Sequence, residues 1–279
     1  MHTPDAIEAS FIFFPQPQLR GDPSHVGLRY EDVWLTAADG NKAHAWFIQG
    51  DDSADPGQKR VLMLITHGNG GNISVRLDQY REFVTRFRHI DIFALEYRGY
   101  GLSEGSPSEE GIALDALAAR RWIDDYVADM PDDRRPSIIY FGRSLGGSVA
   151  TRLASVEPPD ALILECPLLS VPYLAKTITP WRYLPIEKFI HNRFDTESYM
   201  REVRRPVLVM HSEFDEIIPI ECGRMVYKAA EGPKRFYVIK GAPHNGADYY
   251  DPEGYYAAMG QFLSDCGLLQ GVNASLRLE

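Results

Sequence analysis

A serine between two glycines stands near the middle of the sequence. Gly142, Ser144 and Gly146 form the pattern G-x-S-x-G, directly after a short apolar run and before a segment of helical composition. A strand that turns at once into a helix crowds the backbone, and glycines relieve this crowding because they have no Cβ. The serine is then held on a strained turn with its hydroxyl exposed. The pattern predicts that Ser144 is a nucleophile; the alternative is a tight turn without chemistry.

A serine hydroxyl is a weak nucleophile unless a base takes its proton and a third group orients that base. For a serine on such a turn, the usual chain order is serine, acid, histidine. Asp215 lies shortly after the apolar run 207–210, and His244 lies shortly after the run 236–239. Both would lie at carboxyl ends of strands, the sheet edge that also carries Ser144. We therefore predict His244 as the general base and Asp215 as the acid that orients it.

Other residues near these positions leave alternatives open. Glu213 and Glu216 share the loop of Asp215, and Glu165 ends an earlier predicted strand, so each could be the acid. These carboxylates could also be nothing more than a solvated acidic surface, and His244 a surface histidine. We assign structural roles to three further histidines, which are His67, His191 and His211.

Two backbone N–H groups could stabilise the negative charge that develops on a substrate oxygen. Leu145 would be the first residue of the helix after Ser144, where N–H groups point outward. Asn69 lies in the glycine-rich loop 67–72, whose backbone can approach a ligand closely. This loop lacks the lysine and the spacing of a phosphate-binding loop. No group of residues has zinc-ligand spacing, so we expect neither a metal nor another cofactor.

Apolar runs of strand length alternate with segments of helical period, which predicts an α/β fold with a mostly parallel sheet and helices on both faces. A turn at Ala38-Asp39-Gly40 separates two runs that we expect to form an antiparallel hairpin, 31–36 and 44–48. The further predicted strands are 61–66, 92–97, 138–141, 161–164, 207–210 and 236–239.

Residues 167–206 interrupt this alternation with several prolines and aromatic residues, which predicts an inserted lid over the site. Four of its side chains could line an apolar acyl pocket or could only anchor the lid: Tyr173, Leu174, Trp181 and Tyr183. The predicted divisions of the chain are an N-terminal extension 1–27, a core of 28–166 and 207–267, the lid 167–206 and a C-terminal tail 268–279.

Composition and charge exclude several classes of binding partner. The formal net charge of −10 is unfavourable for nucleic acid and for anionic membrane surfaces. Three cysteines without paired spacing predict neither a disulfide framework nor a zinc site. No secretory signal is visible, and the apolar run 11–14 is too short to span a bilayer. We expect a cytoplasmic protein without an integral membrane segment that acts on a small molecule. The oligomeric state stays open.

Several motifs stand in an order that resembles one known family. Loop 67–72 reads HGNGGN, 97–105 reads YRGYGLSEG, 107–111 reads PSEEG and 142–147 reads GRSLGG. This set resembles the bud-emergence-protein-like branch of the α/β-hydrolases, and the likeness continues through 182–185 into the loops of Asp215 and His244, over residues 28 to 265. The resemblance implies the α/β-hydrolase fold, an eight-stranded sheet and the same catalytic triad.

Two positions depart from the pattern of that family. Glu96 stands where an aspartate is more usual before Tyr-Arg-Gly, and Gly246 stands where an acid is common after the histidine. Neither departure removes a catalytic group.

Related hydrolases include carboxylesterases, thioesterases on acylated proteins and peptidase-like enzymes. We predict a serine carboxylesterase that acts through an acyl-enzyme on short-to-medium acyl esters. A thioesterase is the nearest alternative, and a peptidase-like hydrolase comes next. A non-catalytic binding scaffold is the alternative from a different class, because a fold does not fix a function.

Overall fold

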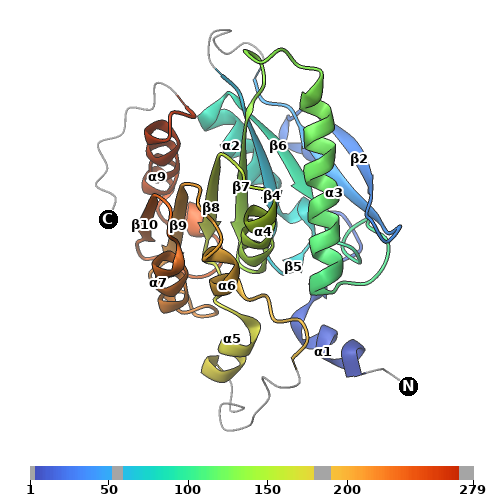
Figure 1. The fold of residues 1–279 in the computed structure, drawn as a ribbon, viewed down its shortest axis with the longest axis vertical. Helices are drawn as coiled ribbons and strands as arrows, with labels where there is room; N and C mark the ends of the chain where they lie inside the picture. Colours follow the sequence, from blue (N-terminus) through green and yellow to red (C-terminus); the bar gives the residue numbers. More distant parts are fainter. Residues whose placement is uncertain (1–3, 52–58, 179–189, 270–279) are drawn as a thin grey trace.

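An eight-stranded sheet runs through the middle of the molecule (Figure 1), with the strand order β10-β9-β8-β7-β4-β6-β3-β2. The computed structural model describes residues 4–51, 59–178 and 190–269. The strands from β10 to β6 run parallel, whereas β3 and β2 are antiparallel to their neighbours. The prediction of a mostly parallel α/β sheet of eight strands is confirmed. The bounds are β2 Tyr30–Thr36, β3 Lys42–Ile48, β4 Val61–Thr66, β6 Ile90–Leu95, β7 Ser137–Arg143, β8 Ala161–Glu165, β9 Val207–Ser212 and β10 Lys234–Ile239.

Strand β4 shows why the central runs carry apolar residues at every position. All six of its residues are buried. Leu62 and Leu64 belong to one hydrophobic core, and Val61, Met63 and Ile65 belong to the other. Successive side chains of a strand point to opposite faces. A continuous apolar run is therefore what a strand needs when helices cover both faces of its sheet.

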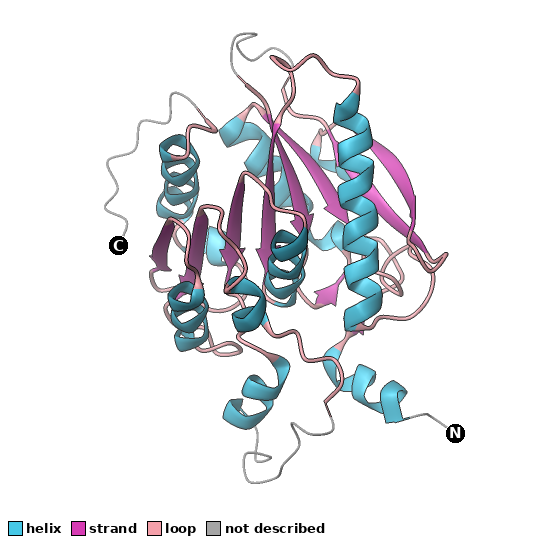
Figure 2. Ribbon diagram, in the orientation of Figure 1, coloured by secondary structure: helices cyan, strands magenta, loops and turns pink. Residues whose placement is uncertain are grey.

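Helices cover both faces of the sheet (Figure 2). One core includes Phe83 of α2 and Met259 of α9, and the other includes Ile112 of α3 and Val149 of α4. The apolar stripes of these four helices face the sheet, which agrees with the helical period of the intervening segments. The bounds are α1 Pro4–Ile12, α2 Leu77–Phe87, α3 Glu109–Ala128, α4 Leu145–Val156, α5 Val171–Ile178, α6 Thr196–Met200, α7 Ile220–Ala229, α8 Ala247–Tyr250 and α9 Pro252–Asp265.

The hairpin prediction is confirmed, since β2 and β3 pair antiparallel in the register Tyr30 to Ile48 and Thr36 to Lys42. The predicted strand 92–97 is wrong at both ends, because β6 covers Ile90–Leu95. A hydrogen bond just beyond Leu95 explains where β6 ends. The Glu96 carbonyl accepts a hydrogen bond from the Ser103 hydroxyl at 3.1 Å, and the chain then turns away from the sheet.

Short elements gather at the carboxyl ends of the parallel strands, toward which the strand arrows of Figure 2 point. Helices α1 and α5 lie beyond this edge in the view of Figure 1. A short parallel pair, β1 (Phe14–Pro15) and β5 (Gly70–Gly71), and the 3₁₀ turn η2 (Ile73–Arg76) also lie here. The other 3₁₀ turn, η1, covers Pro23–Val26. None of the helices in the described part of the chain is long and apolar enough to cross a bilayer. The predicted division boundaries stay predictions.

Candidate active site

Ser144 is the single residue between β7 and α4, and its backbone is strained. It has φ 55° and ψ −119°, a conformation that costs a non-glycine residue about 1–3 kcal/mol. Its N–H donates to the carbonyl of Glu165 at 2.9 Å, which ties the turn to β8. A Cβ at Gly146 would overlap the carbonyl of Thr66, and a Cβ at Gly142 would overlap that of Gly146. The two glycines are therefore a steric requirement of this turn.

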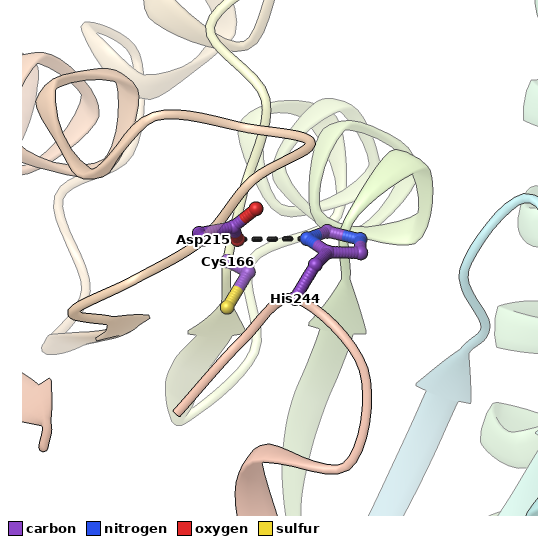
Figure 3. A group of neighbouring side chains, drawn as sticks. All are labelled: Cys166, Asp215 and His244. Atoms are coloured by element: carbon purple, nitrogen blue, oxygen red, sulfur yellow. Dashed lines mark hydrogen bonds and ion pairs between the residues drawn. The ribbon is translucent and has the colours of Figure 1, made fainter. Parts of the chain in front are cut away.

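His244 and Asp215 are hydrogen-bonded to each other (Figure 3). The distance from His244 Nδ1 to Asp215 Oδ2 is 2.7 Å, and both side chains are buried. On its other side, Asp215 Oδ1 accepts the N–H groups of Ile217 at 3.0 Å and Ile218 at 2.7 Å. A carboxylate at this position accepts the Nδ1 proton of the imidazole. The Nε2 atom then carries a lone pair, which is what a general base needs.

The electrostatics keep Asp215 ionised. Burial alone would raise the pKa of Asp215, but hydrogen bonds from His211 and His244, attraction to His244 and the Ile218 N–H hold this pKa well below its ordinary value. The His211 Nε2 atom lies 2.9 Å from the Ile218 carbonyl and 3.5 Å from Asp215 Oδ2. His211 therefore contacts both the Asp215 side chain and the backbone of its loop, in agreement with a structural role.

The other acids considered from the sequence have different partners. Glu216 Oε2 accepts the backbone N–H of His244 at 3.0 Å, and Glu213 accepts a backbone N–H of the following loop at the same distance. Glu165 is paired with Arg143 at 2.9 Å. Among these acids, it is the carboxylate of Asp215 that hydrogen-bonds the ring of His244.

Arg143 connects the serine turn to the histidine loop. Its Nε donates to Glu165, and its Nη2 donates to the His244 carbonyl at 2.8 Å and to Asn245 Oδ1 at 3.1 Å. Burial would lower the pKa of Arg143, but Glu165 outweighs this effect and the pKa is raised. The residue directly before Ser144 thus fixes the backbone of His244 relative to the serine.

The remaining two histidines are tied to acidic side chains. His67 Nε2 lies 2.9 Å from Glu96 Oε1 in a fully buried pair, and Glu96 Oε2 accepts the Ile73 N–H at 2.9 Å. Glu96, the departure from the family pattern, thus joins the end of β6 to the glycine-rich loop. His191 contacts Glu8 of α1 through its Nδ1 at 3.0 Å.

The glycine-rich loop passes directly beside the serine. A Cβ built on Gly68 would lie 3.5 Å from the Ser144 Cβ. Asn69 and Leu145 both line the cavity that Ser144 lines. Leu145 is the first residue of α4, so its N–H is free of the intrahelical bonding pattern. Both predicted oxyanion residues therefore lie at the cavity that contains Ser144, and their role stays a prediction.

A cavity of about 950 Å³ opens over Ser144 and His244. This volume is at the upper end of the usual range for ligand pockets, about 300–1,000 Å³. Apolar side chains form much of its wall, and they come from α1, β1, the start of α4, the segment 168–174 and the acid loop, namely Phe11, Ile12, Phe14, Leu145, Leu168, Val171, Leu174, Ile217 and Ile218. The polar residues nearest the catalytic candidates include Arg143 and Asn245.

The predicted pocket residues differ in their positions. Leu174 lines the cavity. Tyr173 is not among the residues that line the cavity, whereas Val171, Leu174 and Ala175 are. On a helix, residues three and four apart share a face, and the neighbour of Leu174 points elsewhere. The other two predicted residues, Trp181 and Tyr183, lie outside the described residues.

Sequence reasoning missed the contribution of α1. From the sequence, the run 11–14 shows only that it is too short to span a bilayer, yet Phe11, Ile12 and Phe14 line the cavity. Helix α1 is held there by Glu8, which accepts the Asn192 N–H at 2.8 Å, and by the Asn69 side-chain amide, which donates to the Ile12 carbonyl. The apolar run at the end of α1 is the available signal, but a run of this kind does not say which surface it covers.

Cys166 lies beside Asp215 and His244 (Figure 3), and their ligand atoms lie within 4.8 Å of one another. The chemistry of this group does not fit a metal. A metal needs a thiolate, whereas burial raises the pKa of Cys166 well above its ordinary value and keeps the thiol protonated. Asp215 Oδ2 and His244 Nδ1 are already hydrogen-bonded to each other.

Comparisons with known proteins agree with this geometry. Residues 61–204 match the model of the alpha/beta hydrolase family. The chain therefore belongs to the α/β-hydrolase family.

Within the family, two relatives and one solved structure are informative. The chain is 28% identical to protein bem46 of Schizosaccharomyces pombe, over 87% of this chain and 79% of that protein, which supports the bud-emergence-like branch. It is 32% identical to the lysophosphatidylserine lipase ABHD12 of Danio rerio, over 72% of this chain and 56% of that protein. The fold is similar to that of an esterase of Pyrococcus furiosus, with a TM-score of 0.70, 20% identity and coverage of 90% of this chain and 98% of that one.

Proposed function

We propose that this protein is a serine hydrolase that cleaves carboxylic esters through an acyl-enzyme. The observation that carries the proposal is the 2.7 Å hydrogen bond between His244 and Asp215, in a cavity that the strained Ser144 also lines. A strained serine, a histidine with a fixed tautomer and a buried carboxylate are the three parts of a nucleophilic triad.

In the proposed first step, Ser144 Oγ attacks the ester carbonyl and its proton passes to His244 Nε2. The N–H groups of Leu145 and Asn69 hold the resulting oxyanion. When the bond to the alcohol breaks, His244 gives the proton to the leaving oxygen. A water molecule, deprotonated by the same histidine, then attacks the acyl-serine. The bond to Ser144 Oγ breaks, His244 returns the proton to this oxygen, and the carboxylic acid is released.

The cavity supports an acyl chain of short-to-medium length as the substrate group. Its wall is mostly aliphatic and aromatic, and burying an apolar chain against such a wall gives about 0.8 kcal/mol per methylene. Acetyl groups would leave most of the volume of about 950 Å³ empty. We therefore propose that turnover increases from acetyl to medium chains. The relative named as a lysophosphatidylserine lipase supports acyl esters as the substrate class.

We also propose that residues 167–206 act as the cover of this site. Leu168, Val171 and Leu174 from this segment line the cavity, and so does Ile190. Removing or changing this wall should alter which acyl chains fit, and should not alter the serine chemistry itself.

The test is hydrolysis of p-nitrophenyl esters from acetyl to palmitoyl by the full chain, by Ser144→Ala and by Ser148→Ala. Ser148 is a matched control: it lies in α4, it is buried, and its hydroxyl has no hydrogen-bond partner in the described part of the chain. We expect a serine-dependent optimum at short or medium chains that Ser144→Ala abolishes and Ser148→Ala preserves. Turnover of the matched acyl thioesters without ester turnover would instead assign a thioesterase. Folded protein without any turnover would favour a binding scaffold.

A further inference from the structure

Arg76 is a buried cation that hydrogen-bonds only backbone carbonyls of one loop among the contacts that the structure describes. It is the last residue of η2 and is 9% exposed. Its Nη1 donates to the Asn72 carbonyl at 2.7 Å, and its Nη2 donates to the carbonyls of Gly68 at 3.1 Å and Gly70 at 3.2 Å. No ion pair joins its guanidinium to a carboxylate in the described ranges, and its Nε is buried without a hydrogen-bond partner there.

Such an arrangement is hard to explain by a contribution to the stability of the fold. Burial lowers the pKa of Arg76, although attraction to Glu96 opposes this effect, and an arginine stays charged in proteins. In the described ranges the hydrogen-bond acceptors of this charge are neutral carbonyl groups, and a buried charge that no carboxylate contacts directly is normally disfavoured. Positions that break a stability rule in this way are expected at functional sites.

The geometry of a peptide unit connects Arg76 to the proposed oxyanion site. The Gly68 carbonyl and the Asn69 N–H belong to the same planar trans peptide, so they point in opposite directions. A hydrogen bond that holds the Gly68 oxygen therefore fixes the direction of the Asn69 N–H. His67 Nδ1, 2.7 Å from the same oxygen, holds it from a second side.

Arg76 also lies close to the serine, and although it is largely buried it lines the same cavity. A Cβ built on Gly68 would lie 3.5 Å from Arg76 Nη2 and equally far from the Ser144 Cβ, so both groups reach the same part of the loop. A charged donor on a carbonyl polarises its peptide and makes the N–H at the other end a stronger donor. The effect is greater in a low-dielectric interior than in water.

We infer that Arg76 is a positioning residue, which orients and polarises the Gly68–Asn69 peptide so that the Asn69 N–H stabilises the oxyanion. This inference rests on the proposed function. Because the oxyanion exists in the transition state and not in the bound ester, Arg76 acts on kcat and leaves KM nearly unchanged.

The alternative is that Arg76 only fastens the loop to the start of α2. A purely structural role would change the stability, the amount of folded protein and the binding of all ligands alike. The two roles therefore differ in whether a ligand that forms an oxyanion is affected more than one that does not.

The experiment compares Arg76→Met and Arg76→Lys in the full chain, with Arg120→Met as the matched control. Arg120 is a half-buried arginine of α3 that donates to Tyr140 and Asp124. The readouts are kcat and KM for the best ester, the melting temperature, and the inhibition constants of an acyl trifluoromethyl ketone and of the parent methyl ketone. The fluorinated ketone forms a stable oxyanion adduct with an active serine, whereas the parent ketone forms it far less readily.

We expect Arg76→Met to lower kcat about 10–100-fold, less than the loss of a whole oxyanion donor, while KM changes by less than about threefold. Affinity for the trifluoromethyl ketone should fall by the same factor as kcat, and affinity for the parent ketone should not. Arg76→Lys keeps the charge but cannot span three carbonyls, so its loss should be smaller. Arg120→Met should lower the melting temperature and keep both kinetic constants.

Wild-type kcat and ketone affinity in Arg76→Met would overturn the inference, and so would equal losses for both ketones. If Arg76→Met does not fold, Arg76→Lys decides by the same comparison. A wild-type protein that hydrolyses no ester and is not inhibited by the fluorinated ketone would overturn the proposed function, and the role of Arg76 with it.

Discussion

The exchange Asp215→Asn tests the roles of the acid and the histidine, because the structure fixes how an amide would sit in this place. Two backbone N–H groups donate to Asp215 Oδ1, from Ile217 at 3.0 Å and Ile218 at 2.7 Å. The amide oxygen of the asparagine must therefore occupy the Oδ1 position. Its NH₂ group is left facing His244 Nδ1, where the carboxylate oxygen now lies at 2.7 Å.

An NH₂ donor at this position reverses the tautomer of the histidine. His244 must accept at Nδ1 and carry its proton on Nε2, so it can no longer take the proton of Ser144. The exchange also removes the negative charge that stabilises the imidazolium. We expect kcat to fall about 10³-fold or more, which corresponds to about 4 kcal/mol in the activation free energy.

The assay is the initial rate of p-nitrophenyl ester hydrolysis, measured with the melting temperature of each variant. Glu213→Gln is the control, since this carboxylate lies in the same loop and accepts a backbone N–H at 3.0 Å. The control should keep kcat near that of the wild type. A folded Asp215→Asn variant that keeps more than a tenth of the wild-type kcat would refute the reasoning on the tautomer.

Three further predictions concern stability and the cavity. Burial and the charge of Glu165 raise the pKa of Asp248 to about 6, so the folded state loses stability as the pH rises from the ordinary value of 3.8 to this value. Because Asp248 is partly exposed, the effect is smaller than the full pKa shift implies, and Asp248→Asn should add about 1–2 kcal/mol to the free energy of unfolding near pH 8. Near pH 3.5 it should add almost nothing. Urea titration measures both values, and an equal gain at the two pH values would contradict this prediction. Gly146→Ala should lower the free energy of unfolding by about 3 kcal/mol or more in the same titration, because the added Cβ overlaps a backbone carbonyl. Gly147→Ala should lower it by less, since a Cβ at this position would lie 3.1 Å from the Pro167 side chain. Equal losses would argue against the steric requirement of the turn. Leu174→Trp should move the optimum of the ester series to shorter chains without lowering acetyl ester turnover, and an unchanged optimum would mean that the acyl chain lies elsewhere.

Much of the fold could be predicted from the sequence because the signals are local. The run that forms β4 is apolar at all positions, which only a strand covered on both faces requires. The turn around Gly40 predicted the antiparallel pairing of β2 and β3. The proximity of Asp215 and His244 followed from one topological rule: carboxyl ends of parallel strands meet at the same edge of the sheet.

The features that were missed depend on tertiary contacts. Strand β6 ends at Leu95 because the Ser103 hydroxyl donates a hydrogen bond to the Glu96 carbonyl, and the hydropathy pattern of the strand does not reveal that contact. Tyr173 and Leu174 are neighbours of similar apolar character, so only the rotation of α5 decides which one faces the cavity. The role of α1 as a wall depends on Glu8 and Asn69, which are bonded across long stretches of sequence.

The central claim is that Ser144 is the nucleophile, and covalent labelling tests it most directly. A fluorophosphonate probe would be added to the folded full chain, and the labelled peptide would be identified by mass spectrometry. The account predicts one adduct on Ser144, which Ser144→Ala abolishes and Ser148→Ala retains. Folded protein that stays unlabelled, or an adduct on another serine that persists in Ser144→Ala, would contradict it.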